Sequence, residues 1–332
     1  MPYVCVGDTF RQHFFESHRV AMSKILVTGA AGFIGSHTVD RLLRDGHTVT
    51  GIDNFRTGRR ENLVAAQHAS TFTLIEADVA EPGVAENIAR EFQPDAIIHL
   101  AALVSVQESL SDPGLNQRLN VDATFLVAEA ARRQHVARIV FASSAAIYGD
   151  ATKMPIRESA EKAPISPYGA AKLASEVILS GHGASYGITV RCQRYFNVFG
   201  PRQDPASPYS GVISIFARRY REGKGVTIFG DGRQTRDFIS VYDVARANAL
   251  AATRAGVTSG VANICTGRAT SLLEVAAVFA REHPTAHAPR HEPPRPGDII
   301  HSLGAPEAAA AALDFHASVT VQDGLLELIR PG

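Results

Sequence analysis

A phenol and an ammonium group stand four residues apart in Tyr168-Gly169-Ala170-Ala171-Lys172. In a helix, this spacing puts Tyr168 and Lys172 on one face. A free tyrosine has a pKa of about 10, too high for a base at neutral pH. A cation within about 4–6 Å stabilises the phenolate and lowers that pKa. The pair therefore predicts a tyrosine that takes a proton from a substrate hydroxyl, with Lys172 as its supporting cation.

A serine hydroxyl stands 24 residues before that tyrosine, at Ser144, just past a strand-like run. Its hydroxyl can bind the reacting oxygen and share its proton with Tyr168. Ser143 is its direct neighbour and is a second candidate for contact with the substrate. The spacing from Tyr148 favours Ser144 as the catalytic residue.

Glycines at positions 29, 32 and 35 follow one strand-like run and open a helical pattern. Glycine lets the backbone turn tightly and approach a pyrophosphate, and the helix N-terminus supplies the positive end of a dipole. The segment Gly29 to Gly35 therefore predicts a dinucleotide site, with Phe33 and Ile34 as part of it.

Asp53 ends the second strand-like run, 24 residues after Gly29. A carboxylate there can bind both hydroxyls of the adenosine ribose and repels a 2'-phosphate, which favours NAD over NADP. The nearby Arg56 and Arg59 weaken this preference, because an arginine could accommodate the phosphate. The other residues expected at the cofactor are Asn54, Asp78, Val79, Leu100, Ala101 and Ala102.

Short apolar runs alternate with helical patterns from Lys24 onward. This alternation predicts an α/β fold, a Rossmann-type doubly wound parallel sheet covered by helices on both faces. Ligands of such sheets bind beyond the carboxyl ends of the strands. The expected strands are Ile25–Thr28, Thr48–Ile52, Phe72–Glu76, Ala96–Leu100, Arg138–Ala142 and Thr189–Arg194. The expected helices include Ile34–Arg44, Val84–Glu91, Val121–Arg133 and Ala170–Tyr186.

Glycine and proline punctuate shorter elements after Asn197, which indicates a smaller C-terminal α/β lobe that binds the substrate. We expect the NAD-binding domain to span residues 23–197, with residues 235–265 returning to it. Residues 198–234 and 266–332 then form the smaller lobe. Residues 1–22 lack clear periodicity and are expected to form a poorly ordered arm.

Overall composition narrows the class of protein. The 33 basic and 33 acidic residues cancel, so neither nucleic-acid nor membrane-surface binding is indicated. The 3 cysteines and 13 histidines are scattered without the spacing of a metal site, so no metal is expected. With no signal-peptide pattern and no long apolar run, we expect a cytoplasmic enzyme.

Taken together, these motifs resemble a known family. TGxxGxxG, Asp53, SSxxxYG, YxxxK and the run from Arg194 to Gly200 are similar to the extended short-chain dehydrogenase/reductases, and most of all to the UDP-hexose 4-epimerases. The resemblance implies bound NAD, a UDP-sugar substrate and a 4-keto intermediate. It also implies a homodimer through a four-helix interface, for which Val121–Arg133 and Ala170–Tyr186 are candidates.

The same resemblance implies roles for residues nearer the C-terminus. Asn197 matches an asparagine that meets the substrate phosphates. Arg236 and Arg295 match two arginines on the diphosphate, and Asp298 matches an aspartate near the ribose. Two guanidinium groups suit a diphosphate because each offers paired donors.

Alternative reactions differ in what they need beside Ser144. Related 4,6-dehydratases and glucuronate decarboxylases need acidic residues there, whereas this chain has Ala145 and Ala146, which cannot transfer a proton. A 4-ketoreductase would use the same three residues. A non-catalytic NAD-binding sensor would not need Ser144, Tyr168 and Lys172 together.

The sugar is less constrained than the reaction. Ser302 is small at the expected pocket gate and leaves room for an N-acetyl group, as in UDP-GlcNAc or UDP-GalNAc, whereas Val104 and Ala145 argue against a dedicated acetamido site. Arg202 lies near the sugar end and keeps UDP-glucuronate open. We favour UDP-glucose and UDP-galactose.

Overall fold

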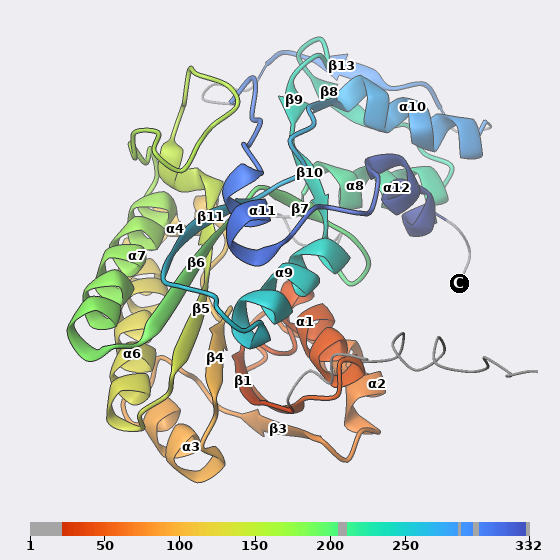
Figure 1. Cartoon of the computed structure of the whole chain (residues 1–332). Coiled ribbons are helices and arrows are strands. Elements are labelled where there is room, and N and C mark those ends of the chain that lie inside the picture. Colours follow the sequence, from red (N-terminus) through yellow and green to blue (C-terminus); the bar gives the residue numbers. More distant parts are fainter. Residues whose placement is uncertain (1–21, 205–210, 285–286, 295–298, 330–332) are drawn as a thin grey trace, which may run out of the picture.

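A parallel sheet forms the centre of the molecule in the computed structural model, which describes residues 22–204, 211–284, 287–294 and 299–329 (Figure 1). Its strand order is β11-β6-β5-β4-β1-β2-β3. Each strand expected from the sequence is present, with ends within two residues of the prediction. The strands are β1 (Lys24–Thr28), β2 (Thr48–Asp53), β3 (Phe72–Glu76), β4 (Ala96–His99), β5 (Arg138–Ser144), β6 (Thr189–Tyr195) and β11 (Gly260–Ile264).

Helices cover both faces of this sheet, so the Rossmann-type doubly wound fold is confirmed. One buried apolar cluster joins the sheet to α1 (Phe33–Arg44), α9 (Val241–Thr253) and α11 (Glu307–Leu313). A second cluster lies on the opposite face, under α3 (Val84–Phe92), α6 (Ala123–Arg133) and α7 (Pro167–Tyr186). Figure 1 shows the two groups of helices on either side of the strands.

Helix α7 carries the Tyr168/Lys172 pair, and its start is closely defined. Pro167 occupies the first helical turn, where its fixed φ suits the helix, and the Ser166 hydroxyl accepts a hydrogen bond from the amide of Gly169 (3.1 Å). The helix ends at Gly187, whose φ of 72° is readily adopted by glycine. The first turn therefore holds Tyr168 in a fixed position beside the sheet.

A π-helical turn, η2 (Gln117–Asp122), precedes α6 where the sequence predicted the start of a regular helix. The side-chain Nδ2 of Asn120 within it donates to the carbonyl of Leu103 (3.0 Å) and to Asn116 Oδ1 (2.8 Å). Such π turns often lie at functional sites. Here the turn ties the loop after β4 to the helices behind it. Two short helices, α4 (Val106–Ser111) and α5 (Pro113–Asn116), lie between that loop and η2.

The smaller lobe is built on its own apolar cluster, contributed mainly by α8 (Val212–Arg221), α10 (Leu272–Glu282) and α12 (Val321–Ile329). Three two-stranded pairings accompany it, β7 (Asn197–Phe199) with β10 (Phe238–Ser240), β9 (Thr235–Arg236) with β12 (Thr270–Ser271), and β8 (Thr227–Phe229) with β13 (Arg290–Glu292).

The chain returns from the smaller lobe to the main sheet. Strand β11 pairs with β6 in parallel, and α9 packs against α1. The earlier part of the returning segment, β9 and β10, pairs with strands outside the main sheet. Of the expected N-terminal arm, only Met22 lies within the described residues, and the domain boundaries stay predictions.

Three short helical segments complete the described chain, η1 (Arg60–Leu63), α2 (Val64–Gln67) and η3 (Ala145–Tyr148). Among the helices that the structure describes, none combines the length and apolarity needed to cross a membrane. Within the same residues, no cluster of three or more histidine, cysteine, aspartate or glutamate side chains could hold a metal ion.

Candidate active site

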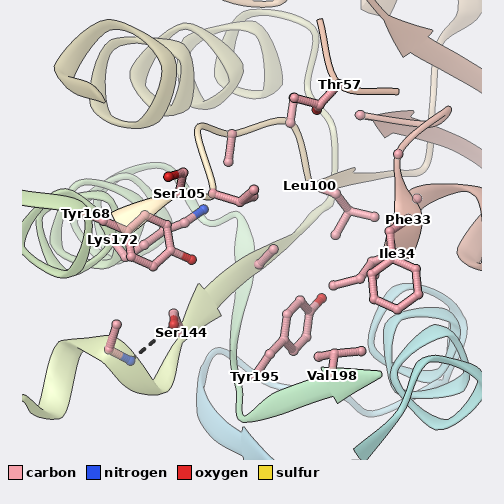
Figure 2. Close-up of a pocket in the computed structure, with 18 of the residues that line it drawn as sticks. Phe33, Ile34, Thr57, Leu100, Ser105, Ser144, Tyr168, Lys172, Tyr195 and Val198 are labelled. Carbon is pink, nitrogen blue, oxygen red and sulfur yellow. Dashed lines mark hydrogen bonds between the residues drawn. The ribbon is translucent and has the colours of Figure 1, made fainter. Parts of the chain in front are cut away.

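A cavity of about 1160 Å³ lies beyond the carboxyl ends of the sheet strands. Figure 2 shows side chains from several of these strand ends, and from α7, around it. The cavity brings together most of the residues that the sequence predicted to bind cofactor or substrate. They are Gly29, Gly32, Phe33, Ile34, Gly35, Asp53, Asn54, Asp78, Val79, Leu100, Ala101, Ala102, Ser144, Tyr168, Lys172, Asn197 and Arg236.

Three predicted substrate residues are not in that set. Ser143 is 2% exposed and its hydroxyl donates to Glu176, because neighbouring residues of a strand point to opposite faces. The structure therefore places Ser143 away from the cavity and Ser144 in it. Arg295 and Asp298 lie outside the described residues, so their roles stay predictions.

The glycine turn fits a dinucleotide pyrophosphate. Gly29 has φ of +70°, and a Cβ there would lie 2.7 Å from the amide nitrogen of Ala101. A Cβ on Gly35 would lie 1.9 Å from the carbonyl oxygen of Gly29, so only glycine lets α1 start this close to β1. Within the described residues, no side chain caps α1 and no acid stands in its first turn. Its first amides are thus available to an anion.

Asp53 links the turn to the segment that follows β2. Its Oδ2 accepts from the amide of Ala31 (2.9 Å) and its Oδ1 from the amide of Phe55 (2.8 Å). Burial raises the pKa of this carboxyl, and the backbone donors oppose that rise. The carboxylate still lines the cavity, where it can meet a ribose.

The three candidate catalytic residues converge on the same cavity. In Figure 2, Tyr168 and Lys172 project from α7, and Ser144 lies at the end of β5. Lys172 Nζ is 6.0 Å from the centre of the Tyr168 ring and 4.9 Å from that of Phe141. Ser144 Oγ accepts a hydrogen bond from the amide of Ala146 (3.1 Å). The arrangement can bind a hydroxyl and move its proton.

The pKa values of Tyr168 and Lys172 differ from what their spacing in the sequence predicted. Burial lowers the pKa of Lys172 to about 7, and the Glu176 carboxylate opposes that shift. Burial raises the pKa of Tyr168, and its hydrogen bond with Ser144 opposes the rise. The predicted lowering of the tyrosine pKa by Lys172 is therefore not found in the protein alone, since desolvation of the phenolate is the larger effect.

Polar and charged side chains from the smaller lobe also line the cavity, and they suit a charged substrate. Arg236 Nη1 donates to the carbonyl of Thr235 (2.9 Å), which holds this guanidinium along the edge of the smaller lobe. Asn197, His301 and Ser302 line the same cavity, and His301 and Ser302 hydrogen bond to Thr235 beside Arg236. The neighbouring Asp237 is fully buried and accepts amide hydrogen bonds from Thr266 and Gly267, so it organises the loop and does not face the cavity.

The sequence and fold match a known protein family. Residues 25–265 match the family described as "NAD dependent epimerase/dehydratase family". The chain belongs to this family. A UDP-glucose 4-epimerase of Mycolicibacterium smegmatis is 38% identical over 308 residues, which cover 92% of this chain and 97% of the relative.

Among the solved structures similar to this chain are two that cover nearly the whole fold. The UDP-glucose 4-epimerase of Thermotoga maritima, determined with UDP-glucose, has a TM-score of 0.86 and 36% identity, covering 92% of this chain and 97% of that one. The UDP-N-acetylglucosamine 4-epimerase of Methanobrevibacter ruminantium, in complex with UDP-N-acetylmuramic acid, has a TM-score of 0.87 and 36% identity, covering 93% and 97%.

Behind the candidate catalytic residues lies a buried polar network that the sequence analysis missed. Glu176, one helical turn after Lys172, forms a two-bond ion pair with Arg194 of β6 (2.9 and 2.7 Å). Arg194 also donates to the hydroxyl of Tyr148 (2.8 Å), which in turn donates to Asn263 of β11 (2.7 Å). A glutamate four residues after the lysine was the available signal.

His99 is a second residue that sequence reasoning missed. It is 1% exposed, and its Nδ1 lies 2.7 Å from Thr28 Oγ1. Burial, with a contribution from the Lys172 charge, lowers the pKa of His99 to about 3, so its ring is neutral. Thr28 Oγ1 also accepts from the amides of Leu100 and Ala101 (3.2 Å each). His99 thus acts through Thr28 on the loop that lines the cavity.

Proposed function

We propose that the chain is an NAD-dependent UDP-hexose 4-epimerase that interconverts UDP-glucose and UDP-galactose through a 4-keto intermediate. One observation carries the proposal. Ser144, Tyr168 and Lys172 share a cavity with the glycine turn, and the residues directly after Ser144 in that cavity are Ala145 and Ala146. The site can therefore exchange a proton at one hydroxyl, and these two positions supply no acid for elimination or decarboxylation.

In this mechanism Tyr168 takes the proton of the sugar 4-hydroxyl and later returns it. Ser144 binds the same oxygen and shares its proton with Tyr168. Lys172 stabilises the phenolate with its cation. When bound, NAD would supply reversible hydride transfer at C4 and a positive charge that favours the phenolate. The 4-keto sugar would turn over in the site before the proton returns from Tyr168. The reaction involves no net redox change.

The cofactor and substrate are assigned to opposite parts of the cavity. The turn from Gly29 to Gly35 would hold the pyrophosphate of NAD, and Asp53 its adenosine ribose. Arg236 and Asn197, with Arg295 and Asp298, would hold the diphosphate and ribose of the UDP-sugar. Guanidinium groups match a diphosphate because they offer paired donors.

The proposal includes a homodimer formed through α6 and α7, with no nucleic acid or membrane as partner. Large apolar or aromatic side chains stand exposed on these helices, at Phe125 (47%), Val177 (65%) and Tyr186 (55%). Their burial against a second copy would complete a four-helix interface.

We place the enzyme in the cytoplasm, because Cys192 and Cys265 are both free, as is usual in reducing compartments.

A second substrate series has support of its own. Ser302 is 8% exposed and lines the cavity, so its small side chain leaves space for an N-acetyl group. The similar Methanobrevibacter enzyme bears the name of a UDP-N-acetylglucosamine 4-epimerase. UDP-glucuronate stays a further alternative. Arg202 lines the cavity, although its guanidinium pairs with Asp40 of α1 (2.7 Å).

The test is direct. The purified chain is incubated separately with UDP-galactose, UDP-GalNAc and UDP-galacturonate, without added cofactor or reductant, and the products are resolved by chromatography. We expect UDP-glucose from UDP-galactose. Faster conversion of UDP-GalNAc would move the assignment to the N-acetyl series. Conversion of none of them, or turnover only of 4-keto sugars with added reductant, would overturn the epimerase proposal.

A further inference from the structure

Two arginines stand at the end of the cavity where the proposed ribose site lies. Arg56 and Arg59 follow β2 and line the cavity together with Asp53. Between them, Gly58 lies so close to Asp53 that a Cβ on it would be 2.8 Å from both carboxylate oxygens. This contact fixes the path of the segment, and it keeps both arginines close to the aspartate.

Each of these arginines is already paired with a carboxylate from a distant part of the chain. The Arg56 guanidinium pairs with Glu108 of α4, 52 residues away. The Arg59 guanidinium pairs with Asp204, 145 residues away, in the loop after β7. Glu108 and Asp204 line the cavity as well.

The charge balance of this region follows from these pairs. A 2'-phosphate on the ribose would add about 1.5 to 2 negative charges. It would meet the carboxylates of Asp53, Glu108 and Asp204, while both guanidinium groups are engaged elsewhere. An arginine accommodates such a phosphate only when its paired donors can turn toward it. The region therefore disfavours NADP more strongly than Asp53 alone would.

We propose that Glu108 and Asp204 are specificity-determining residues, which favour NAD over NADP by neutralising Arg56 and Arg59. The proposal rests on the assignment of the ribose to Asp53. Arg60 provides an internal contrast. It pairs with Glu76 and stacks over Phe55, 4.2 Å from the ring centre, and neither Arg60 nor Glu76 lines the cavity.

The experiment compares full-length variants Glu108→Gln, Asp204→Asn and their combination with the wild type. Each protein is equilibrated with equal concentrations of NAD and NADP and freed of unbound nucleotide. The bound nucleotides are then released by denaturation and quantified. We expect the NADP:NAD ratio to rise in both single variants and by about tenfold or more in the double variant, the scale of a hydrogen bond to a charged group. The matched control, Glu76→Gln, should leave the ratio unchanged.

A second set of variants tests the cause. Adding Arg56→Gln and Arg59→Gln to the double variant should return the ratio to the wild-type value, because the freed cations are then gone. A ratio that stays high without the arginines would overturn the proposal. So would an unchanged ratio in the Glu108 and Asp204 variants. Equal weakening of NAD and NADP would also overturn it, because the pairs would then only hold the cavity closed.

Asp53→Ala separates this inference from the site on which it rests. If Asp53 binds the ribose, this variant loses NAD and its NADP:NAD ratio rises. If Asp53→Ala raises the ratio but the Glu108 and Asp204 variants do not, only the inference fails. If Asp53→Ala changes neither nucleotide, the ribose assignment itself is wrong.

Discussion

The two ends of the cavity use ion pairs in different ways. At the proposed catalytic end, Glu176 and Arg194 join α7 to β6 with side chains that are 7% and 3% exposed. At the proposed adenosine end, the side chains of Arg59 and Asp204 are 56% and 33% exposed. Both pairs bridge separate elements of the fold, so the difference lies in their access to water.

Access to water decides what each pair can contribute. A buried charge that loses its partner has no solvent to replace it, so the pair behind Lys172 holds its elements in one arrangement. An exposed charge is resolvated when its partner is removed, so the pair of Arg59 with Asp204 adds little stability and can adjust the local charge. The catalytic end is therefore rigid, and the adenosine end is adjustable.

The largest expected effect is on catalysis at the rigid end. Tyr168→Phe removes the group that exchanges a proton with the substrate, so kcat should fall by about 10²–10⁴-fold. Bound NAD should remain, measured as nucleotide released on denaturation. Tyr186→Phe, at the exposed end of the same helix, is the matched control and should keep its rate. A loss below about tenfold in Tyr168→Phe would remove the role given to that residue.

The next effect is on stability. Glu176→Gln leaves the buried Arg194 cation without its counter-charge, so the free energy of unfolding should fall by about 3–5 kcal/mol. Denaturant unfolding of the full chain measures this change, and Glu76→Gln, in an exposed pair with Arg60, is the control. A decrease in the free energy of unfolding of less than about 1 kcal/mol would show that the Glu176–Arg194 pair contributes no more than an exposed pair, and the contrast between the two ends of the cavity would be wrong.

The same substitution should change the pH dependence of the rate. Lys172 carries its charge below its pKa, which burial lowers to about 7, while Glu176 opposes that shift. Tyr168 and His99 are titratable groups that also lie beside it. Removing Glu176 should lower the pKa of Lys172 further, so the cation is lost at lower pH. The ratio of variant to wild-type kcat should then decrease as pH rises from about 6 to about 8. A constant ratio would contradict this coupling.

The smallest effect is expected at the adenosine end. Arg59→Gln should change the free energy of unfolding by less than about 1 kcal/mol, because its pair with Asp204 is exposed. The difference should shrink further at high salt, which screens exposed charges. Thermal unfolding at two ionic strengths measures both. A loss comparable to that of Glu176→Gln would show that exposure is not the property that separates the two ends.

Most of the site residues predicted from the sequence were recognised by spacings between residues close together in the chain. The glycine turn, Asp53 at a strand end and the four-residue step from Tyr168 to Lys172 each depend on neighbours in the chain, and all of them line the cavity. The alternation of strands and helices gave the fold for the same reason, because each element leaves its own periodic signal.

What could not be predicted depends on contacts between distant segments. Arg59 and Asp204 lie 145 residues apart, and no local pattern joins them. Glu176 meets Arg194 only because α7 packs beside β6. Ser143 and Ser144 differ by one residue, and the side of the strand on which each lies was fixed only by the sheet. The π turn before α6 follows its tertiary hydrogen bonds, which a helical pattern does not reveal.

The position of β11 has a consequence for how the chain is made. Strand β6 ends at Tyr195, yet its outer neighbour, Gly260–Ile264, comes more than 60 residues later. A ribosome releasing this protein therefore exposes first a sheet whose β6 edge has unpaired backbone groups, a surface prone to association with other chains. That edge is covered only after the first part of the smaller lobe, including α8, and helix α9 have been made. Truncation before residue 264 should therefore yield aggregates and not a separate cofactor-binding domain.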